Sequence, residues 1–150
     1  MVIAILVCLD IILSQNYISI TRYVYKSSEI KKGFKVVHLT DLHNYEFGLK
    51  NCRLLGKVKK EAPDVIFLTG DMLNEDETRT DILINLIEQL VRIAPVYASM
   101  GNHEINYMQC SGNENLITMM KRAGAVVLEK QYIDIEINSV KVRVGGIYGY

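Results

Sequence analysis

Residues 34–43, F-K-V-V-H-L-T-D-L-H, decide the fold of this chain. A run of β-favouring apolar residues, typical of a buried strand, ends in Asp41 and His43, which are separated by one residue. Carboxylate and imidazole groups are common ligands of divalent metals. The stretch therefore predicts a strand that carries two metal ligands at its carboxyl end.

The same arrangement recurs twice further along the chain. Residues 65–71, V-I-F-L-T-G-D, end in Asp71, and residues 96–104, V-Y-A-S-M-G-N-H-E, contain Asn102 and His103. Asp71 follows Asp41 by 30 residues and Asn102 follows Asp71 by 31, about one strand–helix–strand unit in each case. Taken alone, Asp71 could be a helix N-cap and Asn102-His103 an ordinary turn. Together, the three strand ends favour a shared site at one edge of a sheet.

The composition indicates one folded domain. The chain has 150 residues, 49% of them hydrophobic, and its 17 basic and 17 acidic residues give a net charge of zero. This length suits one domain, and the hydrophobic fraction supports a packed core. No nucleic-acid partner is expected, because the basic excess that such binding needs is missing. Cys8, Cys52 and Cys110 lie far apart and form no C-x-x-C pair, so neither a zinc knuckle nor a disulfide framework is expected.

Residues 1–21 are expected to form a transmembrane or signal-anchor helix. Residues 2–13 are apolar except for Asp10, and the stretch 2–20 approaches the roughly 20 residues that span a bilayer. We therefore expect a single-pass protein of the cell membrane, with a polar connector at 22–33; the sequence does not assign the side of the membrane. Asp10, Ser14, Tyr17 and Thr21 fall on one helical stripe, which could face a partner helix or the lipid headgroups. The alternative is a soluble amphipathic helix packed on the domain.

Hydrophobic periodicity predicts an alternating order of strands and helices for residues 34–150. Strands are expected at 34–40, 64–69, 96–100 and 126–128. Helices are expected at 49–62, across the apolar stripe from Leu83 to Val91, and near 113–123, with a loop after the third strand. Alternating apolar residues at 133–137 and 140–144 predict a β-hairpin whose acidic strand pairs with its basic strand. Residues 145–150 are expected to begin a further strand, so the chain is expected to be the front part of a larger domain.

The candidate ligands suit a site with two metal ions. In an extended segment, residues i and i+2 project to the same side, so Asp41 and His43 could reach one ion. Asp71 could lend its two oxygens to two ions, and Asn102 offers a neutral oxygen. This mixed set suits Mn, Fe or Zn more than calcium. Two such ions can clamp a phosphate and generate a hydroxide for in-line attack.

The blocks D-L-H (41–43), G-D (70–71) and G-N-H-E (101–104) together resemble the calcineurin-like metallophosphoesterase family. The apolar N-terminus followed by residues 30–44 is similar to the membrane-anchored bacterial branch of that family. The resemblance covers about residues 34–150. It implies an α/β fold in which a layered β-sandwich is flanked by helices. This domain would be incomplete at its C-terminus and would follow an N-terminal membrane helix.

The resemblance also implies an activity, the hydrolysis of a phosphomonoester, phosphodiester or pyrophosphate by hydroxide attack at a binuclear metal centre. Asp41 and His43 would hold the first ion, Asp71 would bridge both, and Asn102 would hold the second. His103 would be the catalytic residue, lying over the phosphate and protonating the leaving oxygen. The expected partners are a phosphate-ester substrate, with a lipid-linked phosphate as one option, and the membrane.

The residues around the expected ligands have supporting roles in this scheme. Glu104 would support the ligands without binding a metal, and Gly70 and Gly101 would leave room for the substrate. The family also supplies later histidines, including a G-H-x-H block, whereas this chain has three histidines. One of the three, His38, is interpreted as a core or structural residue of the first strand. A truncated, non-catalytic, membrane-tethered remnant therefore stands as the alternative hypothesis. A Rossmann module is disfavoured, because no G-x-G-x-x-G follows a strand.

Overall fold

A four-stranded parallel sheet forms the centre of the computed structural model, which describes residues 17–111 and 115–147. Its strands lie in the order β1 (Val36–Leu39), β2 (Val65–Thr69), β3 (Val96–Ser99) and β4 (Val126–Val127). Leu68 of β2 is in register with Leu39 on one side and with Ala98 on the other. The carboxyl ends of β1, β2 and β3 therefore lie at one edge. This arrangement confirms the predicted α/β class with a parallel sheet.

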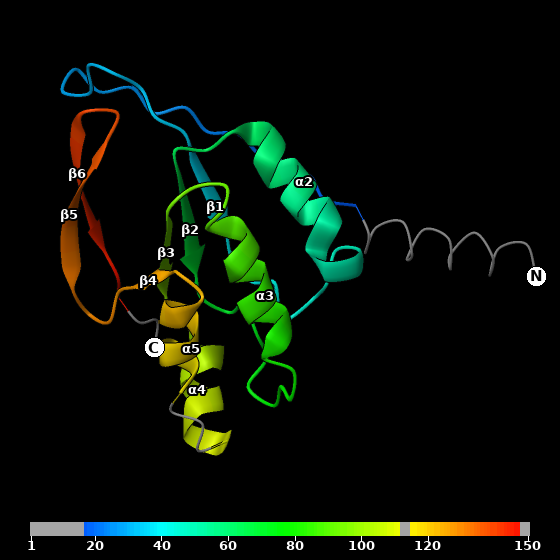
Figure 1. The fold of residues 1–150 in the computed structure, drawn as a ribbon. Coiled ribbons are helices and arrows are strands. Elements are labelled where there is room, and N and C mark those ends of the chain that lie inside the picture. Colours follow the sequence, from blue (N-terminus) through cyan, green and yellow to red (C-terminus); the bar gives the residue numbers. More distant parts are fainter. Residues whose placement is uncertain (1–16, 112–114, 148–150) are drawn as a thin grey trace, which may run out of the picture.

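Helices connect the strands of this sheet (Figure 1). A 3₁₀ turn, η1 (Leu49–Asn51), and α2 (Cys52–Glu61) join β1 to β2, and α3 (Asp81–Leu90) joins β2 to β3. Two further helices, α4 (Asn102–Ser111) and α5 (Leu116–Arg122), lie between β3 and β4 in the chain. In Figure 1, α2 and α3 lie on one side of the sheet, and α4 lies beyond the carboxyl ends of the strands.

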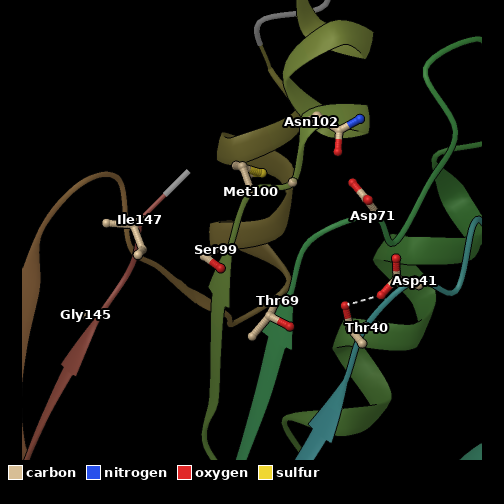
Figure 2. A pocket seen from close by; sticks show the side chains of 10 residues that line it. Thr40, Asp41, Thr69, Asp71, Ser99, Met100, Asn102, Gly145 and Ile147 are labelled. Carbon is tan, nitrogen blue, oxygen red and sulfur yellow. Dashed lines mark hydrogen bonds between the residues drawn. The ribbon is translucent and has the colours of Figure 1, made fainter. Parts of the chain in front are cut away.

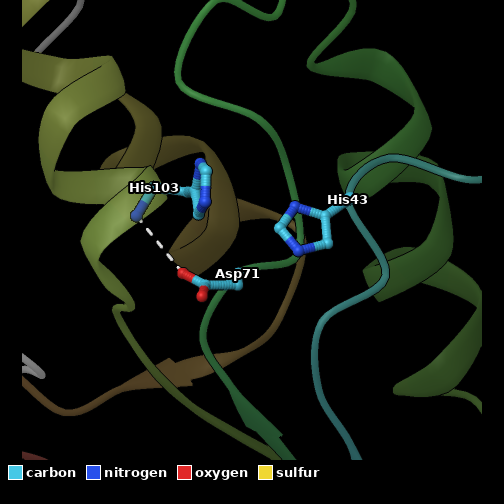
Figure 3. Close-up of side chains that lie close together, drawn as sticks. All are labelled: His43, Asp71 and His103. Carbon is cyan, nitrogen blue, oxygen red and sulfur yellow. Dashed lines mark hydrogen bonds between the residues drawn. The ribbon is translucent and has the colours of Figure 1, made fainter.

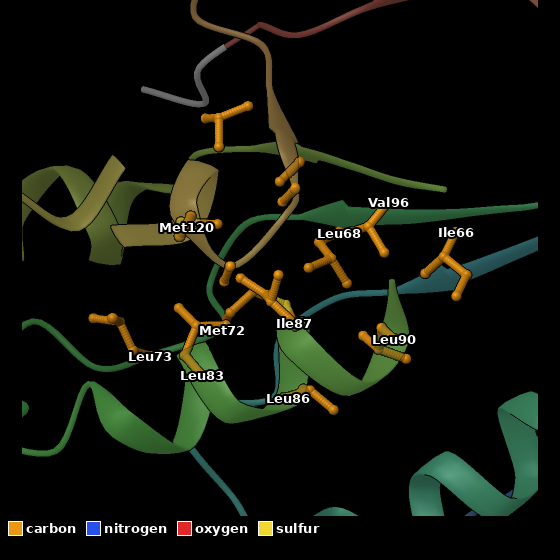
Figure 4. Close-up of a cluster of buried hydrophobic side chains, with 14 of the residues drawn as sticks. Ile66, Leu68, Met72, Leu73, Leu83, Leu86, Ile87, Leu90, Val96 and Met120 are labelled. Carbon is orange, nitrogen blue, oxygen red and sulfur yellow. The ribbon is translucent and has the colours of Figure 1, made fainter. Parts of the chain in front are cut away.

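The core lies between α3 and the sheet (Figure 4). Leu83, Leu86, Ile87 and Leu90 are each at most 3% exposed, and their spacing of three and four residues places them on one helical face. They pack with apolar side chains of the strands, among them Ile66, Leu68 and Val96. Burial of each such side chain stabilises the fold by about 1.5–3 kcal/mol. This core fixes the strands whose ends carry the candidate ligands.

A β-hairpin stands on the other side of the sheet from α2 and α3 (Figure 1). Its strands are β5 (Tyr132–Ile137) and β6 (Val140–Gly145), joined by Asn138 and Ser139, whose φ angles of 51° and 68° suit a two-residue hairpin turn. The Nε of Arg143 donates to Oδ1 of Asp134 at 2.7 Å, and this hydrogen bond lowers the pKa of Asp134. The predicted hairpin and its acidic-to-basic pairing are both confirmed.

Two expectations about secondary structure are wrong. Residues 102–111 were expected to form a loop but form α4, in which polar and apolar residues are mixed around the helix. No new strand begins at Gly145, because this residue ends β6 and residues 146–147 belong to no strand. The remaining residues of that expected strand, 148–150, lie outside the described part of the chain.

The expected membrane helix falls mainly on residues 1–16, outside the described residues. Residues 17–21, its expected end, are not helical. Within 17–111 and 115–147, no helix combines the length and the apolar character that crossing a bilayer requires. The expected connector, residues 22–33, is exposed along its whole length.

Candidate metal centre

Three predicted ligands meet at the carboxyl edge of the sheet. Asp41 follows β1, Asp71 follows β2 and Asn102 follows β3, and all three line a cavity of about 400 Å³ (Figure 2). Hydroxyl groups at the same strand ends line the cavity too, and Oγ1 of Thr40 donates to Oδ2 of Asp41 at 2.6 Å. Ligands from three separate segments, 30 and 31 residues apart, therefore face one space.

A second group of ligand atoms lies on the histidine side of Asp71 (Figure 3). One atom each from His43, Asp71 and His103 can be chosen so that all lie within 4.8 Å of one another. The rings of His43 and His103 meet edge to face, with their centroids 4.9 Å apart. Asp71 is the residue common to this group and to the cavity. It therefore links the cavity to the histidine group.

The backbone at these ligands is left-handed. Asp41, His43 and Asp71 have φ angles of 54°, 45° and 53°. For residues other than glycine, such conformations cost about 1–3 kcal/mol each and concentrate at functional sites. Neither Asp41 nor His43 is extended, so the alternation of an extended segment does not decide where their side chains point. Asp41 lines the cavity, whereas His43 joins the group around His103.

Gly70 and Gly101 allow the loops after β2 and β3 to touch. Gly70 has a φ of +84°, and a Cβ added to it would meet the backbone N and Cα of Gly101. A Cβ on Gly101 would meet Oδ1 and the backbone N of Asp71. Protein atoms thus occupy the space on the Cβ side of both glycines, and Gly101 also lines the cavity.

Glu104 is a buried carboxylate, 1% exposed, that ties these two loops together. Its Oε2 accepts hydrogen bonds from the backbone N–H groups of Asp71 and Gly101, both at 2.8 Å. Its Oε1 accepts from the N–H groups of Met72 at 2.7 Å and Leu73 at 3.1 Å. Glu104 is the third residue of α4, and its bond back to Gly101 is one half of a capping box. This agrees with the expected supporting role.

Asp71 and His103 meet at the start of α4. The backbone N–H of His103 donates to Oδ1 of Asp71 at 3.2 Å, so the carboxylate satisfies one of the free N–H groups of the first helical turn. The ring Nδ1 of His103 is buried and has no hydrogen-bond partner among the described residues. Buried polar atoms are rarely left unpaired in proteins. The ring of His103, which lies beside Asp71 and His43, therefore keeps a nitrogen that suits contact with a bound cation or phosphate.

Asn74 orients His43 and was missed in the sequence, where it opens an acidic loop. Its Oδ1 lies 3.0 Å from Nδ1 of His43, and its Nδ2 donates to the backbone carbonyl of His43 at 3.3 Å. Because an amide oxygen only accepts, this assigns the ring proton to Nδ1 and leaves Nε2 free to bind a metal. Histidine ligands generally have such a partner. The available signal was the position of Asn74, three residues after Asp71.

We expect Asn74→Ala to weaken Mn²⁺ binding by about 10–100-fold, the usual cost of removing the partner of a ligating histidine. The reason is that the ring of His43 loses the bond that fixes its orientation. Isothermal titration with Mn²⁺ measures the effect. Asn85→Ala, at an exposed position of α3, is the control and should bind as the parent does. Equal affinities for both variants would show that Asn74 does not orient a ligand.

The sequence relationships of the chain agree with this geometry. A family model described as Calcineurin-like phosphoesterase matches residues 34–147. The chain is similar to the uncharacterized metallophosphoesterase YkoQ of Bacillus subtilis, with 25% identity over 80% of this chain and 45% of the relative. A metallophosphoesterase of Campylobacter jejuni is 30% identical over 71% of this chain and 28% of the relative. One of Aquifex aeolicus is 25% identical over 89% of this chain and 50% of the relative.

These matches cover half or less of each relative, so the chain corresponds to only part of their length. The family model, by contrast, covers most of the chain, including all three strand ends that carry the candidate ligands. The chain belongs to the calcineurin-like phosphoesterase family.

Proposed function

We propose that this chain carries the metal centre of a phosphoesterase that hydrolyses a phosphomonoester, phosphodiester or pyrophosphate with two divalent ions. One observation carries the proposal, the position of Asp71 between two sets of ligands. On one side it shares a cavity with Asp41 and Asn102, and on the other it lies beside His43 and His103. Family membership independently indicates metal-dependent hydrolysis of phosphate esters.

In this proposal, Asp71 bridges the two ions, and Asp41, His43 and Asn102 supply further ligands from the two sides of Asp71. Mn, Fe or Zn at these positions would polarise the phosphate ester and make bound water more acidic. The protein itself contributes fixed dipoles, because the amino end of α4 begins at Asn102 and favours negative charge. A phosphate in the cavity would therefore meet both the ligands and the start of this helix.

The direct test is hydrolysis of an aryl phosphodiester by the chain with Mn²⁺. The same assay is run on a version extended by the reading frame beyond Tyr150. Activity that EDTA removes and Mn²⁺ restores is the expected result. If neither version hydrolyses this ester, an aryl phosphomonoester or pyrophosphate with Mn²⁺, Fe²⁺ or Zn²⁺, the proposed activity is wrong.

His103 is proposed to protonate the leaving oxygen. We expect His103→Asn to lower kcat about 100-fold, the low end for loss of an acid–base group, with little change in Mn²⁺ affinity. His38→Asn is the control. The structure places His38 on β1 with an exposed side chain bonded to Oγ1 of Thr69, so it is not a core residue. A large loss of Mn²⁺ affinity in His103→Asn would instead make His103 a ligand.

The second candidate is a non-catalytic chain that holds one ion. It is favoured by the fact that the described residues contain one group of three His, Cys, Asp or Glu ligands, not two. Metal titration separates the candidates. Two tight Mn²⁺ sites per chain would contradict the single-ion candidate, and one weak site would contradict a complete binuclear centre.

We also propose a β-sandwich with an N-terminal anchor in the cell membrane. The hairpin supports a second layer, because it stands opposite α2 and α3 (Figure 1). On β2 and β3, Phe67 and Tyr97 have ring centroids 6.0 Å apart and are only partly buried, as expected where a further layer packs. A lipid-linked phosphate is the narrower substrate proposal. Faster turnover of such a lipid in vesicles than of a soluble aryl ester would support it, and the reverse order would contradict it.

A further inference from the structure

The connector, residues 22–33, exposes large apolar side chains that no other described residue covers. All twelve of its residues are exposed. Tyr23, Val24 and Tyr25 are consecutive and 76%, 81% and 90% exposed. Single exposed apolar residues are ordinary, but adjacent ones at this exposure commonly mark an interaction surface.

The connector is held in a defined position beside α2. Arg22 forms an ion pair with Glu61 at the end of that helix. Just before the connector, the ring of Tyr17 lies 5.6 Å from Nζ of Lys57, and Ile18 packs against the core. The chain just before the exposed tyrosines is therefore tied to α2 and to the core.

This face is basic, although the whole chain has a net charge of zero. The connector carries one acidic residue, Glu29, and four basic residues, Arg22, Lys26, Lys31 and Lys32. Lys59 and Lys60, at the exposed end of α2, add positive charge beside Arg22. We call the connector together with these two lysines the connector face. Basic residues interleaved with tyrosines match the chemistry of an anionic lipid surface, which attracts lysine and takes up aromatic rings at the headgroup level.

The position of this face also suits a bilayer. The connector enters β1 at its amino end, whereas the candidate metal centre lies at the carboxyl ends of the strands (Figure 1). In the sequence, the apolar stretch 2–13 ends nine residues before Arg22. A membrane at the connector face would therefore leave the metal centre open to water.

We propose that the connector face binds the surface of an anionic membrane. Tyr23, Val24 and Tyr25 enter the headgroup region, and Lys26, Lys31 and Lys32 contact anionic headgroups. This surface is separate from the proposed catalytic centre, so its test does not depend on phosphoesterase activity. It also differs from a membrane-spanning helix, because the contact is made by residues of the connector itself.

A single tryptophan tests the proposal, because the chain has none. In Val24→Trp, we expect vesicles that contain phosphatidylserine to shift the emission to the blue and to protect the indole from acrylamide. Pure phosphatidylcholine vesicles should do neither. Tyr132→Trp, at a 64% exposed position of the hairpin, is the matched control and should not respond. The two probes separate contact by the connector from attachment of the chain through any other segment.

Charge reversal completes the test. In the Val24→Trp background, Lys26→Glu, Lys31→Glu and Lys32→Glu together should abolish the shift. Reversal of three exposed basic residues outside the connector face, Arg92, Arg122 and Lys141, should preserve the shift. The proposal is overturned by no shift, by an equal shift at position 132, by an equal shift with neutral vesicles, or by the same shift with an oligonucleotide and no lipid.

Discussion

Asp71→Asn is expected to abolish Mn²⁺-dependent hydrolysis and to weaken the binding of both ions at once. Asp71 is shared by the cavity that contains Asp41 and Asn102 and by the group that contains His43 and His103. The substitution replaces one anionic oxygen by an amide nitrogen, which cannot bind a cation. Removing the hydrogen-bond partner of a ligand lowers metal affinity by up to about 100-fold. Because Asp71 is itself a proposed ligand, its substitution should lower the affinity by more than that. Metal titration and turnover of an aryl phosphodiester measure the two effects.

The substitution preserves most of the local structure, because an asparagine side chain still offers an oxygen to the N–H of His103. A loss of activity would therefore report on the metal and not on unfolding, and a circular dichroism melt checks this. Asp76→Asn, in the exposed acidic loop that follows the same strand, is the control and should behave as the parent. Unchanged turnover in Asp71→Asn would remove the metal mechanism altogether.

The arrangement of the strands could be predicted because the local and long-range signals agree. Each of the three strands that lead to the site is a β-favouring apolar run, and a carboxylate or amide residue follows it. A spacing of 30 and 31 residues then leaves room for one helix between successive strands. The hairpin could be predicted as well, because apolar residues alternate with acidic residues before Asn138-Ser139 and with basic residues after it. In the hairpin, the pattern of burial follows the alternation of the sequence, whereas in β1, expected to be a buried strand, no residue is buried.

The details of the site could not be predicted, because they arise from contacts between segments far apart in the sequence. Helix α4 has no apolar stripe, and its start is fixed by Asp71, which accepts the N–H of His103 from a loop 32 residues away. The left-handed conformations of Asp41 and His43 depend on backbone bonds to the loop of Gly70 and Asp71. Asn74 meets His43 across 31 residues. Periodicity carries no information on such pairs.

Glu104 shows how much of the site depends on one such contact. Its two oxygens accept four backbone N–H groups, from Asp71, Met72, Leu73 and Gly101. In Glu104→Gln, one oxygen becomes an amide group, so two of these N–H groups face a donor. Each buried group left unsatisfied costs about 1–3 kcal/mol. We therefore expect the free energy of unfolding to fall by about 4 kcal/mol, a large share of the roughly 5–15 kcal/mol of a whole domain.

Urea denaturation measures this loss, and Glu88→Gln is its matched control. Glu88 is an exposed glutamate of α3, so the same chemical change there should alter stability by no more than about 0.5 kcal/mol. A value for Glu104→Gln as small as that of the control would mean that the four bonds do not contribute to the fold in solution.

The same substitution should also weaken Mn²⁺ binding, although Glu104 is not proposed to touch a metal. Its bonds to Asp71 and Gly101 hold the loops after β2 and β3 against each other, and these loops carry Asp71 and Asn102. Stability and metal affinity should therefore fall together in Glu104→Gln. In Asn74→Ala, by contrast, affinity should fall while stability stays close to that of the parent, because only the exposed bonds of Asn74 to His43 are removed. If both variants lost affinity and stability in the same proportion, Glu104 would have no positioning role beyond its effect on the fold.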